Sequence, residues 1–291
     1  MATAGEEYDK IYDRHRGRRW MNLGYSDATA EDLFKTENYA QVCENLATEL
    51  AEGAKLESGD VVVDVGCGYG IQDVHFLKQT PGIEITAVNI SDQQIEGAKE
   101  DLAQYPEEIR NSITYVTGDA ADLPIEDSFA DKLISLESTA HFRTRDRFFA
   151  EAWRVLKPGG TLAIADIIGD ASPVKPEIKG VWNSPLIRMM RGVCRIFQVG
   201  KEMDICPVEN QFSKEVFVQK LEALGFEGVS VRDLSPNIAL WPNQRYSDMV
   251  KWWNMVPRPW QHRSTQTQHL IPTFANHSLD YLLICAKKPE A

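Results

Sequence analysis

The sequence is short of positive charge. Among its 291 residues, 31 Lys and Arg stand against 43 Asp and Glu, which gives a formal net charge of −12 at pH 7. Proteins that bind nucleic acid or an anionic lipid surface gain much of their affinity from clustered Lys and Arg. The sequence has no basic stripe that would override this balance, so we expect neither nucleic acid nor a membrane as a partner.

Cysteines and long apolar runs are scarce as well. The five cysteines are an odd number and include no Cys-x-x-Cys pair, which favours reduced thiols over a disulfide framework or a zinc site. The sequence also has no group of Asp and Glu residues at the spacing of metal ligands, so we predict no site for another metal ion. No apolar run reaches transmembrane length, and the first residues have neither the basic region nor the apolar segment of a signal peptide. We therefore expect a cytoplasmic protein.

What the chain does have is a glycine-rich turn directly after a buried strand. Residues 61–65 are Val-Val-Val-Asp-Val, an apolar and β-branched run that is typical of a buried parallel strand. Gly66, Gly68 and Gly70 follow, and residues 71–79 have the apolar spacing of a helix. Glycine lets a ligand approach the main chain closely, and the start of a helix offers unpaired N–H groups. The stretch therefore predicts a ligand site at the tip of a sheet.

Strands and helices continue to alternate after this turn. Further strands are predicted at residues 83–90, 113–117, 130–136, 161–165, 229–233 and 279–286. This pattern predicts an α/β fold with a Rossmann-like, doubly wound, mostly parallel seven-stranded sheet. Ligands bind such sheets at the carboxyl ends of the strands. Five polar residues lie at or just past the ends of four predicted strands: Asn89, Asp119, Glu137, His141 and Asp166.

The glycine turn does not match two common nucleotide motifs. A dinucleotide site has Gly-x-Gly-x-x-Gly and an acid about 20 positions later, whereas here residue 71 is Ile and the corresponding position holds Asn89. A nicotinamide cofactor is therefore disfavoured. No Gly-Lys-Ser/Thr follows the turn, which excludes a P-loop.

Residues 58–168 resemble the class I S-adenosylmethionine-dependent methyltransferases. The resemblance rests on four motifs in a fixed order: Val63–Gly70, Gly118–Ala120, Asp127–Phe129 and Arg154–Gly160. Residues 89–94 and 137–141 are most similar to the small-molecule branch that includes γ-tocopherol methyltransferase and the rebeccamycin sugar O-methyltransferase. The resemblance implies S-adenosyl-L-methionine as cofactor and a small, partly hydrophobic hydroxylated metabolite as substrate.

The pattern of predicted elements divides the chain, with two long irregular segments that we interpret as a lid, and the resemblance implies a set of binding residues. We expect one methyltransferase domain over 1–291: an N-terminal helical cap (1–57), a cofactor-binding core (58–168), an inserted helical lid (169–212 and 235–276) and the remaining core (213–234 and 277–291). Gly66, Cys67 and Gly68 would line the methionine and ribose portions of the cofactor. Asp119 and the Ala120 N–H would form hydrogen bonds with the adenine. The full set implied to bind cofactor is Tyr25, Gly66, Cys67, Gly68, Asn89, Ile90, Gln94, Asp119, Ala120, Glu137 and Ser138.

The proposed chemistry depends on His141 and Asp166. Transfer of a methyl group to a hydroxyl requires removal of a proton, and an imidazole can take a proton near neutral pH. His141 is therefore the candidate general base, with Asp166 orienting it or binding the acceptor hydroxyl; alternatively, Asp166 only caps the following turn. Transfer to carbon or nitrogen is an alternative to O-methylation, as is a cyclase or interaction module that binds the cofactor without transferring methyl. The sequence predicts no particular oligomeric state.

Overall fold

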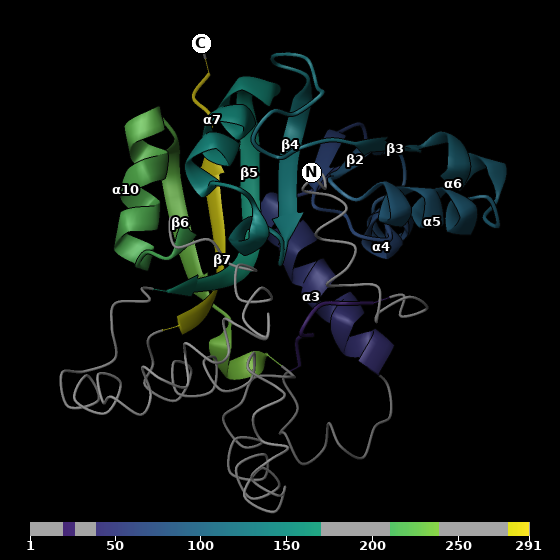
Figure 1. Cartoon of the computed structure of the whole chain (residues 1–291), viewed down its shortest axis with the longest axis horizontal. Helices are drawn as coiled ribbons and strands as arrows, with labels where there is room; N and C mark the ends of the chain where they lie inside the picture. The colour runs from purple at the N-terminus through teal and green to yellow at the C-terminus, as the bar shows by residue number, and fades with distance from the viewer. Residues whose placement is uncertain (1–19, 27–38, 170–209, 239–278, 291) are drawn as a thin grey trace, which may run out of the picture.

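The computed structural model describes residues 20–26, 39–169, 210–238 and 279–290 (Figure 1). Its sheet has seven strands in the order β3-β2-β1-β4-β5-β7-β6. The strands are β1 (Val61–Val65), β2 (Glu84–Asn89), β3 (Ile113–Thr117), β4 (Ala130–Leu136), β5 (Leu156–Gly169), β6 (Glu227–Asp233) and β7 (Leu279–Lys287). Strands β1 to β5 pair in parallel, whereas β7 runs antiparallel to both β5 and β6. The predicted mostly parallel, Rossmann-like sheet is confirmed.

Helices cover both faces of this sheet. They are α3 (Tyr39–Ala54), α4 (Ile71–Gln79), α5 (Asp92–Leu102), α6 (Glu107–Asn111), α7 (Arg145–Val155) and α10 (Lys214–Leu224), with short 3-10 turns η2 (Thr139–His141) and η5 (Ser235–Asn237). Val62 packs with α3 and α4 in one apolar cluster, while its neighbour Val63 packs with α7 and α10 in the other. Successive side chains of a strand point to opposite faces, so the continuous apolar run in β1 supplies both layers.

The helix ends follow the local signals in the sequence. Ser91 precedes α5, and its Oγ accepts a hydrogen bond from the Gln94 N–H at 3.0 Å. Ser213 caps α10 in the same way, and Gly225 ends that helix with φ +103°. Serine before a helix and glycine after it are common capping residues, because the serine oxygen accepts from an unpaired N–H and glycine adopts a positive φ. The Gln94 side chain, however, accepts a hydrogen bond from Asn89 Nδ2 at 2.6 Å, so it supports the preceding strand end.

Strand β5 is longer than the predicted strand 161–165. It begins at Leu156, before the predicted start at Thr161, and continues to Gly169. Leu156 pairs with Ala130 of β4, whereas the antiparallel partner β7 explains the extension beyond Ala165, because its pairing runs from Thr161–Lys287 to Gly169–Leu279. The prediction that this strand ends at Asp166 is therefore wrong: Asp166 lies within β5, opposite Leu282.

Two predicted regions fall largely outside the described residues. The helical lid at 169–212 and 235–276 is described only at residues 169, 210–212 and 235–238. Of the predicted helical cap, α3 is a helix of 16 residues that packs on the sheet. Within the described ranges, no helix is long and apolar enough to cross a membrane. The same residues contain no group of three His, Cys, Asp or Glu side chains that could hold a metal ion.

Candidate active site

Two hollows lie side by side at the carboxyl ends of β1, β2 and β4. The first hollow is lined by Val65, Gly66, Val88, Asn89, Ile90, Gly118, Asp119, Ala120, Ser138, His141, Phe142 and Arg143. The second hollow is lined by Met21, Asn22, Gly66, Cys67, Gly68, Tyr69, Ile71, Gln72, Leu136, Glu137, Ser138 and His141. Gly66, Ser138 and His141 belong to both, so the two hollows meet at these residues.

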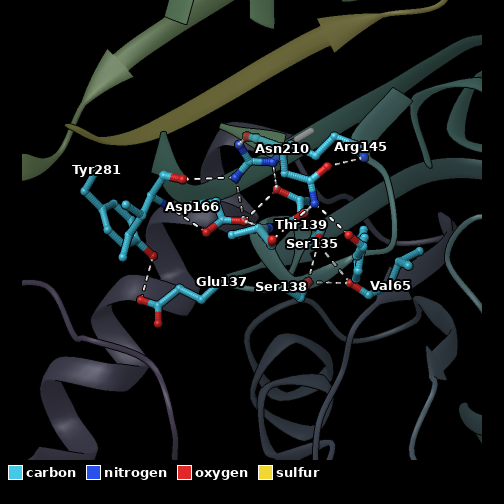
Figure 2. A network of polar contacts seen from close by, with 12 residues as sticks. Val65, Ser135, Glu137, Ser138, Thr139, Arg145, Asp166, Asn210 and Tyr281 are labelled. Carbon is cyan, nitrogen blue, oxygen red and sulfur yellow. Dashed lines mark hydrogen bonds and ion pairs between the residues drawn. The ribbon is translucent and has the colours of Figure 1, made fainter. Parts of the chain in front are cut away.

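The glycine loop forms the boundary between the hollows. Gly66 has φ +89°, and a Cβ at this position would lie 2.3 Å from Ser138 Oγ. The Gly66 N–H donates to Val88 O of β2 at 2.7 Å, while Ser138 Oγ donates to Val65 O at 2.9 Å. Ser135 Oγ also donates to Val65 O, and the two serine hydroxyls are 2.6 Å apart (Figure 2). The loop is thus fixed from β2 and β4, and only glycine fits at residue 66.

The polar residues of the first hollow are Asn89 and Asp119. Asn89 Nδ2 donates to Gln94 Oε1, and Gln94 is buried and is not a lining residue, so Gln94 acts on this hollow through Asn89. Asp119 Oδ1 accepts from the Ala121 N–H at 2.8 Å, and its Oδ2 accepts from Arg143 Nη2 at 3.0 Å. Both predicted binding residues therefore lie in one hollow, with their side chains already oriented by neighbours.

The polar residue that enters the second hollow from β4 is Glu137. Its Oε1 accepts hydrogen bonds from the Leu23 N–H at 2.9 Å and from the Tyr281 hydroxyl at 2.8 Å (Figure 2). Its backbone has φ +51°, a conformation that non-glycine residues rarely adopt. Burial raises the pKa of Glu137 to about 8, although both hydrogen bonds favour the charged form. Glu137 thus joins the end of β4, the N-terminal segment and β7 at the edge of the hollow.

The N-terminal segment 20–26 closes one side of the second hollow. Asn22 Nδ2 donates to Cys43 O of α3 at 3.2 Å, and Asn22 Oδ1 accepts from the Gly24 N–H at 3.0 Å. Met21 and Asn22 line the hollow, whereas Tyr25 pairs with Ile238 in an isolated bridge and is not a lining residue. Sequence reasoning found this segment but chose Tyr25 within it; cofactor contact by Tyr25 stays a prediction.

A pair of buried carboxyl groups lies beneath the glycine loop. Asp64 of β1 and Asp73 of α4 are both fully buried. Asp64 Oδ2 accepts from Gln72 Nε2 at 2.9 Å, and Gln72 in turn lines the second hollow. Burial raises the pKa of Asp64 to about 6; burial, together with the nearby Asp64, raises that of Asp73 well above its ordinary range. Asp64 thus orients Gln72, which lines the second hollow.

His141 ends the η2 turn that follows β4. Asp166 Oδ2 accepts from Thr139 Oγ1 at 2.6 Å and from the Ala140 N–H at 2.9 Å. Asp166 is 2% exposed and does not line either hollow. Asp166 thus holds the turn that carries His141, and it does not cap a turn that follows it, because it lies within β5. Any catalytic role of Asp166 would therefore act through the backbone that carries His141.

Sequence reasoning missed Arg145 and Asn210, which complete the contacts around this turn. Arg145 Nη2 lies 3.6 Å from Asp166 Oδ2, and Asn210 Nδ2 donates to Phe142 O at 2.6 Å. Asn210 is 68 residues from Phe142 in the sequence, in a segment predicted as lid. No local pattern marks it, so only the tertiary structure could have identified it.

A family model described as "Methyltransferase domain" matches residues 63–164. The erythromycin 3''-O-methyltransferase of Saccharopolyspora erythraea is 31% identical over 234 residues, which cover 79% of this chain and 70% of that enzyme. The chain belongs to the S-adenosylmethionine-dependent methyltransferases. Within this family its relatives are small-molecule enzymes of natural-product type, and this methyltransferase accordingly uses S-adenosyl-L-methionine as its cofactor.

Solved structures share the fold of this methyltransferase. The cyclase SpnF superposes with a TM-score of 0.68 at 20% identity and covers 99% of this chain and 95% of its own. Geranyl diphosphate C-methyltransferase from Streptomyces coelicolor A3(2), solved with S-adenosyl-L-homocysteine, superposes with a TM-score of 0.67 at 16% identity. The match covers 99% of this chain and 98% of that enzyme. These likenesses establish the Rossmann-like methyltransferase fold.

The two hollows fit the cofactor in chemistry. Gly66 and Gly68 leave the main chain open to a ligand, which a Cβ would obstruct. Asn89 and Asp119 supply polar groups in the first hollow, where an adenosine offers hydroxyl and amino groups. The second hollow, with Met21, Asn22 and Glu137, mixes apolar and polar lining as a methionine chain requires.

Proposed function

We propose that this methyltransferase transfers the methyl group to a hydroxyl of a small, partly hydrophobic natural product, with His141 as general base. The observation that carries the proposal is the location of His141, which lines both hollows where they meet. A base has to lie within hydrogen-bond distance of the acceptor oxygen but off the line from sulfur through the methyl carbon to that oxygen, because the proton leaves the oxygen as the methyl group arrives. The relative from Saccharopolyspora erythraea, an O-methyltransferase by name, supports transfer to oxygen.

We assign different parts of the cofactor to different lining residues. We assign the adenine and ribose to the first hollow, through Asp119, Asn89 and the backbone of Ala120 and Ile90. The methionine part would lie in the second hollow along Gly66, Cys67 and Gly68, with Ser138 and Glu137 beside it. When bound, S-adenosylmethionine supplies an already activated methyl group. The main task of the protein is then alignment, since holding reactants in attack geometry contributes more than proton removal.

His141 takes the proton of the acceptor hydroxyl in this account. Its backbone is fixed by the η2 turn, which Asp166 caps through Thr139 and Ala140. Asp166 therefore contributes by orienting His141 and not by binding the acceptor. A fixed base is effective because proton transfer requires hydrogen-bond distance to the hydroxyl.

Replacing His141 with alanine tests the assignment. A panel of hydroxylated macrolide glycosides, aromatic polyketides and sterols would first identify an acceptor that the wild-type protein methylates. On that acceptor, His141→Ala is expected to lower kcat about 10²- to 10⁴-fold, the usual contribution of a general base. Binding of S-adenosylhomocysteine should change little, and added imidazole should restore part of the rate. Full turnover by His141→Ala would refute the base assignment.

A second candidate is transfer to carbon or nitrogen, with Glu137 receiving the proton. Glu137 lines the second hollow, and burial raises its pKa to about 8, so its ionised form, which prevails above pH 8, is a stronger base than an ordinary carboxylate. Glu137→Gln discriminates between the candidates. It should abolish transfer in the carbon or nitrogen reaction and leave most of the rate of the O-methylation.

A further inference from the structure

The turn that carries His141 is held from two sides by different side chains. On its donor side, the Thr139 hydroxyl and the Ala140 N–H both donate to Asp166 Oδ2, at 2.6 and 2.9 Å. On its acceptor side, Asn210 Nδ2 donates to Phe142 O at 2.6 Å and lies 3.2 Å from Ala140 O. The carboxylate of Asp166 thus accepts hydrogen bonds from the donors of the turn, and the amide of Asn210 donates to its carbonyl groups (Figure 2).

Arg145 joins these two side chains into one unit. Its Nε donates to Thr139 Oγ1 at 3.1 Å, and its Nη1 donates to the Asn210 carbonyl at 2.6 Å. The Arg145 N–H also donates to Asn210 Oδ1 at 2.7 Å. The guanidinium lies 5.6 Å from the ring centres of both Phe212 and Phe217, which cover it on two sides. Arg145 is 1% exposed and Asn210 is 0% exposed, so water does not replace these bonds.

We infer that Asn210 is a positioning residue for the methyl transfer, which fixes His141 through the carbonyl groups of its turn. Asn210 lines neither hollow, so it does not act by touching substrate or cofactor. The amide nitrogen of Asn210 donates to Phe142 O, one residue beyond His141. The amide oxygen accepts from the Arg145 N–H. This inference rests on the proposed role of His141 as base.

The physical reason is the small size of the turn. A three-residue 3-10 turn has few internal hydrogen bonds, and its remaining backbone groups need outside partners. Removing the Asn210 amide would leave the part-buried carbonyl groups of Ala140 and Phe142 without this donor, and the turn would move to find other donors. A displacement of about 1 Å at a catalytic group can lower a rate about 10²-fold. The bonds of Asn210 thus set the rate through the location of His141.

Two substitutions test this inference with a matched control. Asn210→Ala removes the amide, and Arg145→Lys keeps the positive charge beside Asp166 but loses the planar fork that reaches Asn210 and Thr139. Ser213→Ala serves as control, because it removes a helix-capping bond in the same segment without touching the turn. For each variant, kcat, KM, the Kd for S-adenosylhomocysteine and the NMR signals of ¹³C-labelled histidine would be measured. The His141 signal is assigned by its loss in His141→Gln.

The expected result is a loss of kcat of about 10-fold or more in Asn210→Ala and in Arg145→Lys, with the Kd for S-adenosylhomocysteine within about threefold of wild type. The His141 signal should shift in both, whereas Ser213→Ala should leave it in place. Asn210→Ala combined with His141→Ala should be no slower than His141→Ala alone, because both changes remove the same contribution.

Two results would overturn the inference: an unchanged His141 signal in both variants, or losses that multiply in the double variant. Failure of the proposed function is distinguishable from these. If His141→Ala keeps full turnover, the base assignment fails, and the His141 signal in Asn210→Ala still decides whether Asn210 holds the turn. Where Asn210→Ala does not fold, Arg145→Lys provides the same readouts.

Discussion

The two hollows are built from different parts of the chain. Every residue that lines the first hollow lies between Val65 and Arg143, within one continuous stretch. The second hollow also takes Met21 and Asn22 from the N-terminal segment, and its Glu137 is held by Tyr281 of β7. The first hollow is therefore a local product of strand, turn and helix, whereas the second exists only when distant segments have packed together.

This difference corresponds to the extent of the matched family model. The model spans residues 63–164 and so includes all of the first hollow, but not the N-terminal segment or β7. The first hollow, to which we assign the adenosine, can therefore be encoded in one compact unit. The second hollow, to which we assign the methionine part of the cofactor, also needs segments from outside that unit, where loops and termini tolerate change. Substitutions in the two hollows should accordingly affect different measurements.

The largest effect is expected at Gly66, which both hollows share. Gly66→Ala would bring a Cβ to within 2.3 Å of Ser138 at φ +89°, so the loop would have to open. We expect binding of S-adenosylhomocysteine to weaken by about 10²-fold or more, measured by calorimetry. Gly59→Ala is the matched control, since Gly59 has φ +96° but nothing within 4 Å of the added Cβ. Equal losses in both variants would mean that backbone strain alone, and not the contact with Ser138, explains the effect.

A smaller effect is expected at Asn89, which belongs to the first hollow alone. Asn89→Ala removes the side chain that is oriented by Gln94 and that we assign to the ribose. The Kd for S-adenosylhomocysteine should rise about 10-fold, because a buried polar contact contributes about 1–1.5 kcal/mol. The KM for the acceptor should stay near its wild-type value. A change in the acceptor KM with an unchanged cofactor Kd would contradict the assignment of Asn89 to the cofactor.

The effect expected at Glu137 concerns stability and not the affinity for the cofactor. Because the folded pKa is raised from 4.5 to about 8, protonated Glu137 favours the native state, and this contribution is lost as pH rises from about 4.5 to 8. Glu137→Gln stays neutral, so its free energy of unfolding should exceed that of wild type by roughly 1–3 kcal/mol at pH 8.5 and by little at pH 4. Urea denaturation at both pH values measures this difference.

Tyr281→Phe sharpens the test of Glu137. The Tyr281 hydroxyl donates to Glu137 and so favours its charged form. Without that bond the pKa of Glu137 should rise further, and the loss of stability should move to higher pH. A gain in Glu137→Gln that does not depend on pH would mean that Glu137 is not the titrating group.

The fold was predictable because its signals are local. The β-branched run at 61–65, Ser91 before α5 and Gly225 after α10 each determine one element, and all three agree with the structure. The extension of β5 past Asp166 was not predictable, because it depends on pairing with β7, more than a hundred residues later in the chain. Hydrophobic pattern fixes where a strand lies but not how far a distant partner extends it.

The candidate site divides in the same way. Asn89, Asp119 and His141 follow strands, so their location at the edge of the sheet could be predicted from the strands alone. Which oxygen or nitrogen atom each of these side chains presents to a ligand could not be predicted, because this depends on neighbours such as Gln94. Asn210 was invisible in the sequence, since a lone asparagine far from the motifs carries no pattern.

The most direct test of the central claim is the position of the transferred methyl group. The purified protein would be incubated with methyl-labelled S-adenosylmethionine and the panel of hydroxylated natural products, and mass-spectrometric fragmentation would locate the label. We predict label on a hydroxyl oxygen of the acceptor, with transfer that is lost in His141→Ala. Label on carbon or nitrogen, or S-adenosylhomocysteine binding without any transfer, would contradict O-methylation by a His141 base.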